Sequence, residues 1–209
     1  LADNQFGADS TINFTTGNYA IFELLGTTQT VAGINSTSTY GIIQNRQFGP
    51  GSGGTGKLIL NGSGTYSYSS YIRDNWTPNN SGTFSLEMAG TGTQTLSGAN
   101  INYAGDTTVT DGRLILSNAT GFRSPNVAIA SELEVALTTT WNVPNITFTG
   151  DGTLIKSGGG TMTAGRSGNT YISMDQGGLI DVQGGVLRND YRRGFWSANK
   201  ASMNIESGA

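Results

Sequence analysis

The amino-acid sequence predicts an all-β fold, a parallel β-solenoid in which short strands stack in successive coils. The main observation is that apolar and polar residues alternate in runs of about four to six, and Gly, Asn or Asp bounds most runs. The composition agrees, because 32 of the 209 residues are glycine, about twice the usual share, and only 12% are charged. With 35% hydrophobic residues the chain can still bury a core.

Two segments show the strand pattern most clearly. Residues 57–61 (Lys-Leu-Ile-Leu-Asn) and 113–117 (Arg-Leu-Ile-Leu-Ser) each place two leucines on one face and polar residues on the other. We expect these leucines to point into one continuous apolar interior, stacked in parallel coils together with Ile180 and Val182.

Further segments of the same kind run along the chain, and no helix is predicted. They are residues 11–15, 127–143, 145–149, 172–174, 180–182 and 203–205. Their spacing is irregular, which coils of variable length tolerate better than a propeller does. At roughly 20–25 residues per coil and about 4.8 Å between coils, the sequence predicts about 8–10 coils over about 40–50 Å.

Three dipeptides favour a different fold. Asn-Gly at 61–62 and Asp-Gly at 111–112 and 151–152 are typical of two-residue hairpins, which join antiparallel strands. An antiparallel β-sandwich or jelly roll is therefore the alternative. Gly and Asn also suit the tight corners of a solenoid, where a positive φ angle is needed.

Several classes of function are disfavoured by composition. The formal charge of −3 argues against a nucleic-acid partner, and no run of 18 apolar residues predicts a membrane span. The chain contains no cysteine and no histidine, which excludes disulfides, zinc sites built on these residues and catalysis by a nucleophile–histidine pair. We expect no cofactor and no metal site.

One long segment carries a family resemblance. Residues 90–119 read GTGTQTLSGANINYAGDTTVTDGRLILSNA, a string that closely resembles the autotransporter-associated β-strand repeat. Residues 150–163 look like a weaker copy, with a lysine inside a glycine-rich stretch. Residues 64–82 and 186–201 match nothing in this motif.

The resemblance implies a right-handed parallel β-helix that is displayed outside a bacterial cell. We expect residues 1–209 to form a single segment of a longer repeat array, with a structural or adhesive role and no catalytic activity. Neither end looks like a polar cap, so we expect end-to-end contact with neighbouring repeats or with other copies of the chain. The alternative function is a carbohydrate-binding or polysaccharide-degrading β-helix.

A pair of carboxylates would distinguish these alternatives, because polysaccharide cleavage needs two carboxyl groups. Glu132 and Glu134 lie two positions apart on a predicted strand and project to one face. Since Leu133, Val135 and Leu137 would turn inward, we expect both glutamates on a solvated outer face. No catalytic residue is predicted.

Candidate contact residues form two clusters of aromatic and arginine side chains. These residue types are enriched at binding hot spots, which favours contact with a glycan or a protein. On the alternative interpretation, the rings cover a coil and the arginines are solvated. The residues are Tyr71, Arg73 and Trp76 in one cluster, and Tyr191, Arg192, Arg193, Phe195 and Trp196 in the other.

Overall fold

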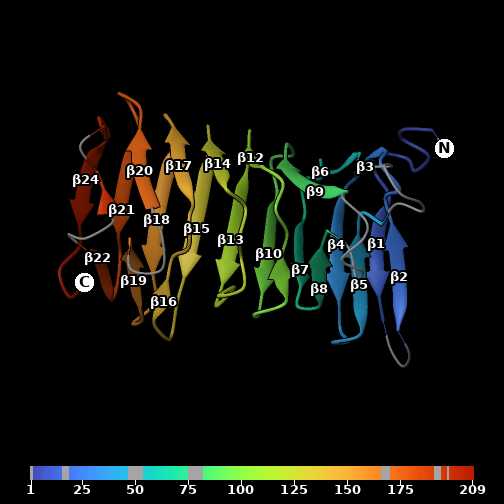
Figure 1. Ribbon diagram of the computed structural model, residues 1–209, viewed down its shortest axis with the longest axis horizontal. Helices are drawn as coiled ribbons and strands as arrows, with labels where there is room; N and C mark the ends of the chain where they lie inside the picture. The colour runs from blue at the N-terminus through green and yellow to red at the C-terminus, as the bar shows by residue number, and fades with distance from the viewer. Residues whose placement is uncertain are drawn as a thin grey trace.

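The computed structural model is an elongated stack of parallel strands that form a β-solenoid (Figure 1). Among the described residues the chain contains 24 strands and no helix, so no described helix could cross a membrane. The described residues are 2–15, 19–46, 54–74, 82–165, 170–190, 194–196 and 198–209.

The strands lie on three faces, which the chain visits in turn. Face 1 contains the pair β1 (Thr11–Phe14) and β4 (Gly33–Ser36), then β7 (Thr65–Tyr68), β10 (Thr93–Ser97), β13 (Arg113–Ser117), β15 (Glu132–Ala136), β18 (Thr153–Ser157), β21 (Leu179–Val182) and β24 (Ser202–Ile205). Face 2 contains β2 (Ala20–Glu23), β5 (Gly41–Gln44), β8 (Tyr71–Arg73), β11 (Ile101–Asn102), β16 (Trp141–Asn142), β19 (Thr161–Ala164) and β22 (Val186–Asn189). Face 3 contains β3 (Thr28–Val31), β6 (Thr55–Leu60), β9 (Thr83–Met88), β12 (Thr107–Val109), β14 (Asn126–Ile129), β17 (Thr147–Gly150), β20 (Thr170–Met174) and β23 (Gly194–Phe195).

The register of face 3 gives the length of each coil. Thr28 pairs with Lys57, 29 positions further on, and Lys57 pairs with Ser85, 28 positions further on. The later steps along the same face take 20 to 24 residues. The stack therefore has about seven turns. The prediction of 8–10 coils was too high because the steps from β3 to β6 and from β6 to β9 take more than 25 residues each.

The interior is one continuous apolar core, as predicted. Within a strand such as β9 or β15, every second residue is buried. The leucine pairs of β6 and β13 and the Ile180/Val182 pair all belong to this core, although they come from different faces. Since all of these strands pair in parallel, the antiparallel sandwich is wrong.

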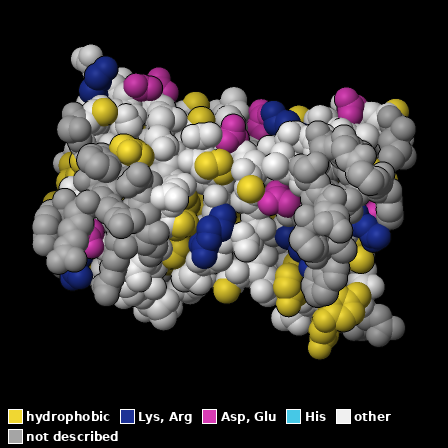
Figure 2. Space-filling view, viewed as in Figure 1, with side chains coloured by type: hydrophobic (Ala, Val, Ile, Leu, Met, Phe, Trp, Pro, Cys, Tyr) yellow, Lys and Arg dark blue, Asp and Glu magenta, His cyan; other side chains and the backbone are white. Residues whose placement is uncertain are grey.

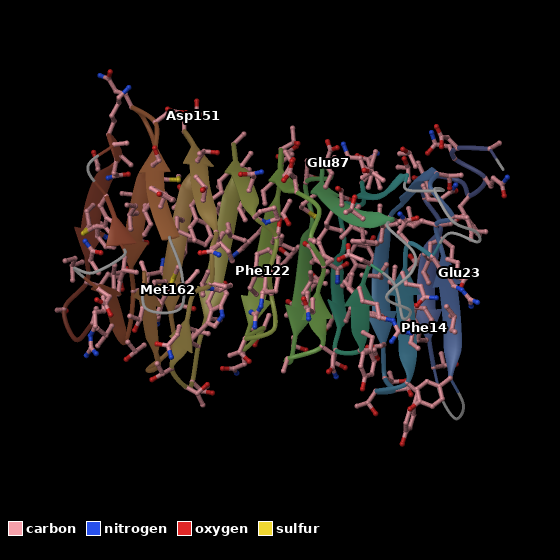
Figure 3. The ribbon with its side chains drawn as sticks, viewed as in Figure 1. Phe14, Glu23, Glu87, Phe122, Asp151 and Met162 are labelled. Carbon is pink, nitrogen blue, oxygen red and sulfur yellow. The ribbon has the colours of Figure 1, made fainter. Side chains whose placement is uncertain are left out.

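Aromatic rings form a column inside the middle of the stack. Phe84, Tyr103, Phe122 and Trp141 come from successive coils, and their neighbouring ring centroids lie 5.1, 5.6 and 6.4 Å apart in edge-to-face contact. Figure 3 shows Phe122 midway along the long axis. Edge-to-face pairs of this kind stabilise a core beyond the area that they bury, so each ring also fixes the register of its coil.

The dipeptides that suggested hairpins form the corners between face 3 and face 1. At these corners successive coils pack backbone against backbone, which leaves no space for a side chain. A Cβ atom on Gly112 would lie 2.3 Å from the carbonyl oxygen of Gly90, and Gly112 also has a φ angle of 59°. The Asn-Gly and Asp-Gly pairs therefore turn the chain from one sheet to the next.

The N-terminal edge of face 3 is covered by residues 2–5. Asn4 N donates to Thr28 O at 2.8 Å, and the Asp3 carboxylate accepts a hydrogen bond from Thr28 N at 2.7 Å. Gln5 N donates to the side-chain oxygen of Gln29 at 2.9 Å. The prediction that neither end is capped is wrong at this position, because polar residues satisfy the backbone N–H and C=O groups of Thr28 in β3.

Candidate functional site

The predicted contact residues do not form one site. Tyr71 and Arg73 lie in β8 on face 2, whereas Phe195 belongs to β23 and Trp196 follows it at the C-terminal end of the stack (Figure 1). The other four predicted contact residues lie outside the described residues: Trp76, Tyr191, Arg192 and Arg193.

Tyr71 and Arg73 line a shallow pocket of about 350 Å³ on the outer side of face 2. The remaining lining residues are Asp74, Ala99, Asn100 and Asn102. The pocket follows from strand register, because Arg73 pairs with Asn102 and Ile72 N donates to Asn100 O. Ile72 and Ile101 are buried on the inner side, so their neighbours on each strand point outward.

A row of polar side chains holds Arg73 in place across three coils. The Arg73 Nε–H group donates to the amide oxygen of Gln44 at 2.9 Å, and the Gln44 amide nitrogen donates to the Glu23 carboxylate at 2.7 Å. Arg46 adds an ion pair with Glu23 at 3.7 Å. Gln44 is buried, so the hydrogen bonds that its side chain makes are shielded from water, which strengthens them.

Asp74 closes one end of the pocket and connects it to the following coils. Its carboxylate accepts hydrogen bonds from Phe84 N at 2.7 Å and from Ala104 N at 2.9 Å. Burial raises the pKa of Asp74, and the two backbone donors act in the opposite direction. Because backbone donors already occupy this carboxylate, it serves as a turn anchor.

The glutamate pair lies on the outer side of face 1, as expected, but both carboxylates face one arginine. Arg113 lies 2.7 Å from the Glu134 carboxylate and 3.8 Å from that of Glu132, and Ser157 also donates to Glu134. The arrangement links β13, β15 and β18 across three coils. Among the described residues in Figure 2, acidic and basic side chains lie interspersed on the face in view.

The C-terminal end of the stack exposes apolar residues that continue the core. Met203 and Ile205 pair with the buried residues Ile180 and Val182, yet they are 44% and 64% exposed. Trp196 packs partly against the core beside them. An apolar pocket of about 220 Å³ lies at this end, lined by Val182, Gly185, Val186, Leu187, Trp196, Met203, Ile205 and Ala209.

A buried lysine joins two coils near the same end. The Lys156 ammonium group donates to the carbonyl oxygens of Ser157, Gly158 and Gly184 at 2.7 to 2.9 Å. Burial lowers the pKa of Lys156, because the charged form is poorly solvated there. This residue is the lysine of the weaker repeat copy, and it satisfies the carbonyl groups of a tight corner.

Comparison with known families identifies the central coils. The segment from β9 to β13 contains the Gly-rich corner and the paired strands described above. Residues 86–116 match the passenger-associated-transport-repeat. This repeat occurs in autotransporter passenger domains and is not a catalytic family, which confirms the resemblance drawn over residues 90–119. No curated protein and no solved structure matches the chain.

Sequence reasoning missed Asp74, Asn100 and Asn102. Asn100 lies inside the passenger-associated-transport-repeat and Asp74 follows Arg73 directly, but no linear pattern places them together. Strand register would have brought Asn102 beside Arg73, since a coil of 29 residues separates them. This register was not evident because the first coils have irregular lengths.

Proposed function

We propose that the chain is a non-catalytic structural module of a secreted or surface-displayed bacterial protein, which lengthens by end-to-end stacking of β-solenoids. The passenger-associated-transport-repeat and the parallel seven-stranded sheet that runs from β7 to β24 support this function. The observation that carries the stacking is the exposure of Met203 and Ile205 at positions that are buried in the five preceding strands of that sheet, from β10 to β21.

Unsatisfied polar atoms at the same end support the proposal. The indole nitrogen of Trp196 and the side-chain oxygen of Asn199 are buried and have no hydrogen-bond partner among the described residues. Buried polar groups normally have partners, and a further coil would bring backbone donors and acceptors to this position. Burying Met203 and Ile205 as well would contribute about 1–3 kcal/mol each.

For the isolated chain, the covering coil comes from a second copy docked head to tail. Within the described residues, β1 and β2 are edge strands at the N-terminal end, where Ile21 is 49% exposed. At the C-terminal end, the edge strands among the described residues are β22, β23 and β24. Such a contact is heterologous and grows into an open filament when its rotation does not close.

A charge placed on the apolar end tests this proposal. Ile205→Asp would bury a carboxylate in the contact, so we expect it to abolish concentration-dependent association in light scattering and electron microscopy. Ser202→Asp is the matched control, since it adds the same charge to the outer side of β24. Monomeric behaviour of the parent chain at high concentration, or equal association of parent and Ile205→Asp, would refute the stacking.

A further inference from the structure

We propose that the pocket beside β8 and β11 binds a neutral glycan, with Tyr71 as the stacking ring and Asn100 and Asn102 as the hydrogen-bonding groups. The proposal goes beyond the structural function proposed above and does not rest on it. It concerns the outer side of face 2, whereas the stacking proposal concerns the end of the solenoid.

The pocket presents groups that match a sugar ring. Asn100 and Asn102 are exposed, lie two positions apart with buried Ile101 between them, and their amides have no hydrogen bond to any described residue. A carboxamide offers a donor and an acceptor side by side, which pairs with two neighbouring hydroxyl groups. Tyr71, on the adjacent strand, adds an aromatic face for the apolar C–H side of a pyranose.

The pocket is held in shape before any ligand binds. Arg73 is anchored to Gln44 on the preceding coil, and Asp74 is anchored to the backbone N–H groups of Phe84 and Ala104. These side chains line the pocket and are already fixed. Ordering them would therefore reduce the binding free energy of a ligand only a little. A volume of about 350 Å³ falls within the usual range for small-ligand sites.

The charges favour a neutral sugar over an acidic one. Arg73 and Asp74 line the same pocket with opposite formal charges, so the site has no net positive charge to attract a uronate. A sugar carboxylate would also lie near the carboxylate of Asp74, which is already partly desolvated, and like charges at such a distance repel. Hydroxyl groups carry no such penalty.

Titration calorimetry with defined oligosaccharides tests the proposal. The probes are hexasaccharides of glucose, mannose, galactose and N-acetylglucosamine, with polygalacturonate as the acidic comparison. We expect saturable binding of at least one neutral probe, weakened about tenfold by Tyr71→Ala and about tenfold by the double variant Asn100→Ala/Asn102→Ala. Tyr19→Ala is the matched control, because Tyr19 is 68% exposed and lies outside the pocket.

The outcomes separate this proposal from the stacking proposal. Each titration is repeated with Ile205→Asp, and unchanged binding there shows that the sugar site does not depend on association. Unchanged thermal unfolding of the pocket variants shows that they retain the fold. The glycan proposal is overturned when no neutral probe saturates, when only polygalacturonate binds, or when Tyr71→Ala binds as tightly as the parent.

Discussion

The stability of the solenoid at alkaline pH depends on two buried tyrosines. The rings of Tyr68 and Tyr103 are fully buried, and burial raises the pKa of each hydroxyl above its ordinary value of 10.0. For Tyr103, the hydrogen bond with Thr107 at 2.7 Å opposes the shift and the charge of Asp74 adds to it. The folded chain therefore keeps both protons at a pH where the unfolded chain loses them.

The sign and size of the effect follow from proton linkage. Because the folded state binds more protons, its stability is fully present below pH 10 and falls as the pH rises above that value. Each buried tyrosine lowers the free energy of unfolding by about 1.4 kcal/mol per pH unit well above pH 10, and the pair by about 2.7 kcal/mol. Lys156 acts with the opposite sign, since burial lowers its pKa from 10.5, and its contribution levels off by about pH 11.5.

Tyr103→Phe isolates one of the two contributions. Urea unfolding followed by tryptophan fluorescence from pH 9 to 11.5 should give a slope against pH that is smaller by about 1.4 kcal/mol per unit than that of the parent. Below pH 10 the variant should be less stable than the parent by about 1–3 kcal/mol, because Thr107 loses its hydrogen-bond partner, and this difference should shrink as the pH rises above 10. Phe122→Leu is the control, as it destabilises the same column without a titrating group. Superimposable slopes for the parent and Tyr103→Phe would refute the reasoning.

Two further predictions concern charged residues. Lys156→Met should lower the free energy of unfolding by about 2–4 kcal/mol, because three charged hydrogen bonds are lost against the relief of one buried charge. The control is Lys57→Met, which breaks an outer ion pair with Glu87 and should lower the free energy of unfolding by less than about 1 kcal/mol. Both losses are measured by calorimetric unfolding, and equal losses would contradict the role given to Lys156. In a reducing-end assay, the double variant Glu132→Gln/Glu134→Gln and the parent chain should both leave polysaccharides uncleaved. Cleavage by the parent that disappears in the double variant would show that these carboxylates are catalytic.

The strand pattern of the sequence was sufficient to predict the interior of the fold. Alternation in residues 57–61 and 113–117 predicted which leucines are buried, since side chains on a strand point to opposite sides with a period of two. The number of coils could not be predicted as well. Coil length depends on the linkers between strands, and a linker leaves no periodic signal in the sequence.

The candidate site was predicted only in part. Tyr71 and Arg73 were recognised from composition, and the structure places both at one pocket. The distant cluster around residues 191–196 does not join them, because linear density of aromatic residues says nothing about which coil a residue occupies. Asp74 was missed since its role depends on backbone N–H groups 10 and 30 positions away.

The corners of the solenoid differ in how much insertion they tolerate. Up to β21, linkers from face 3 to face 1 contain one to four residues, whereas those from face 2 to face 3 contain four to ten. Backbone packing at glycine keeps the first kind short. The second kind is longest directly after β5 and β8, and the linker after β8 begins at Asp74, which lines the pocket together with Tyr71. New binding segments can therefore be grafted at this corner without disturbing strand register, which makes it the natural position for variation between related coils and for engineered insertions.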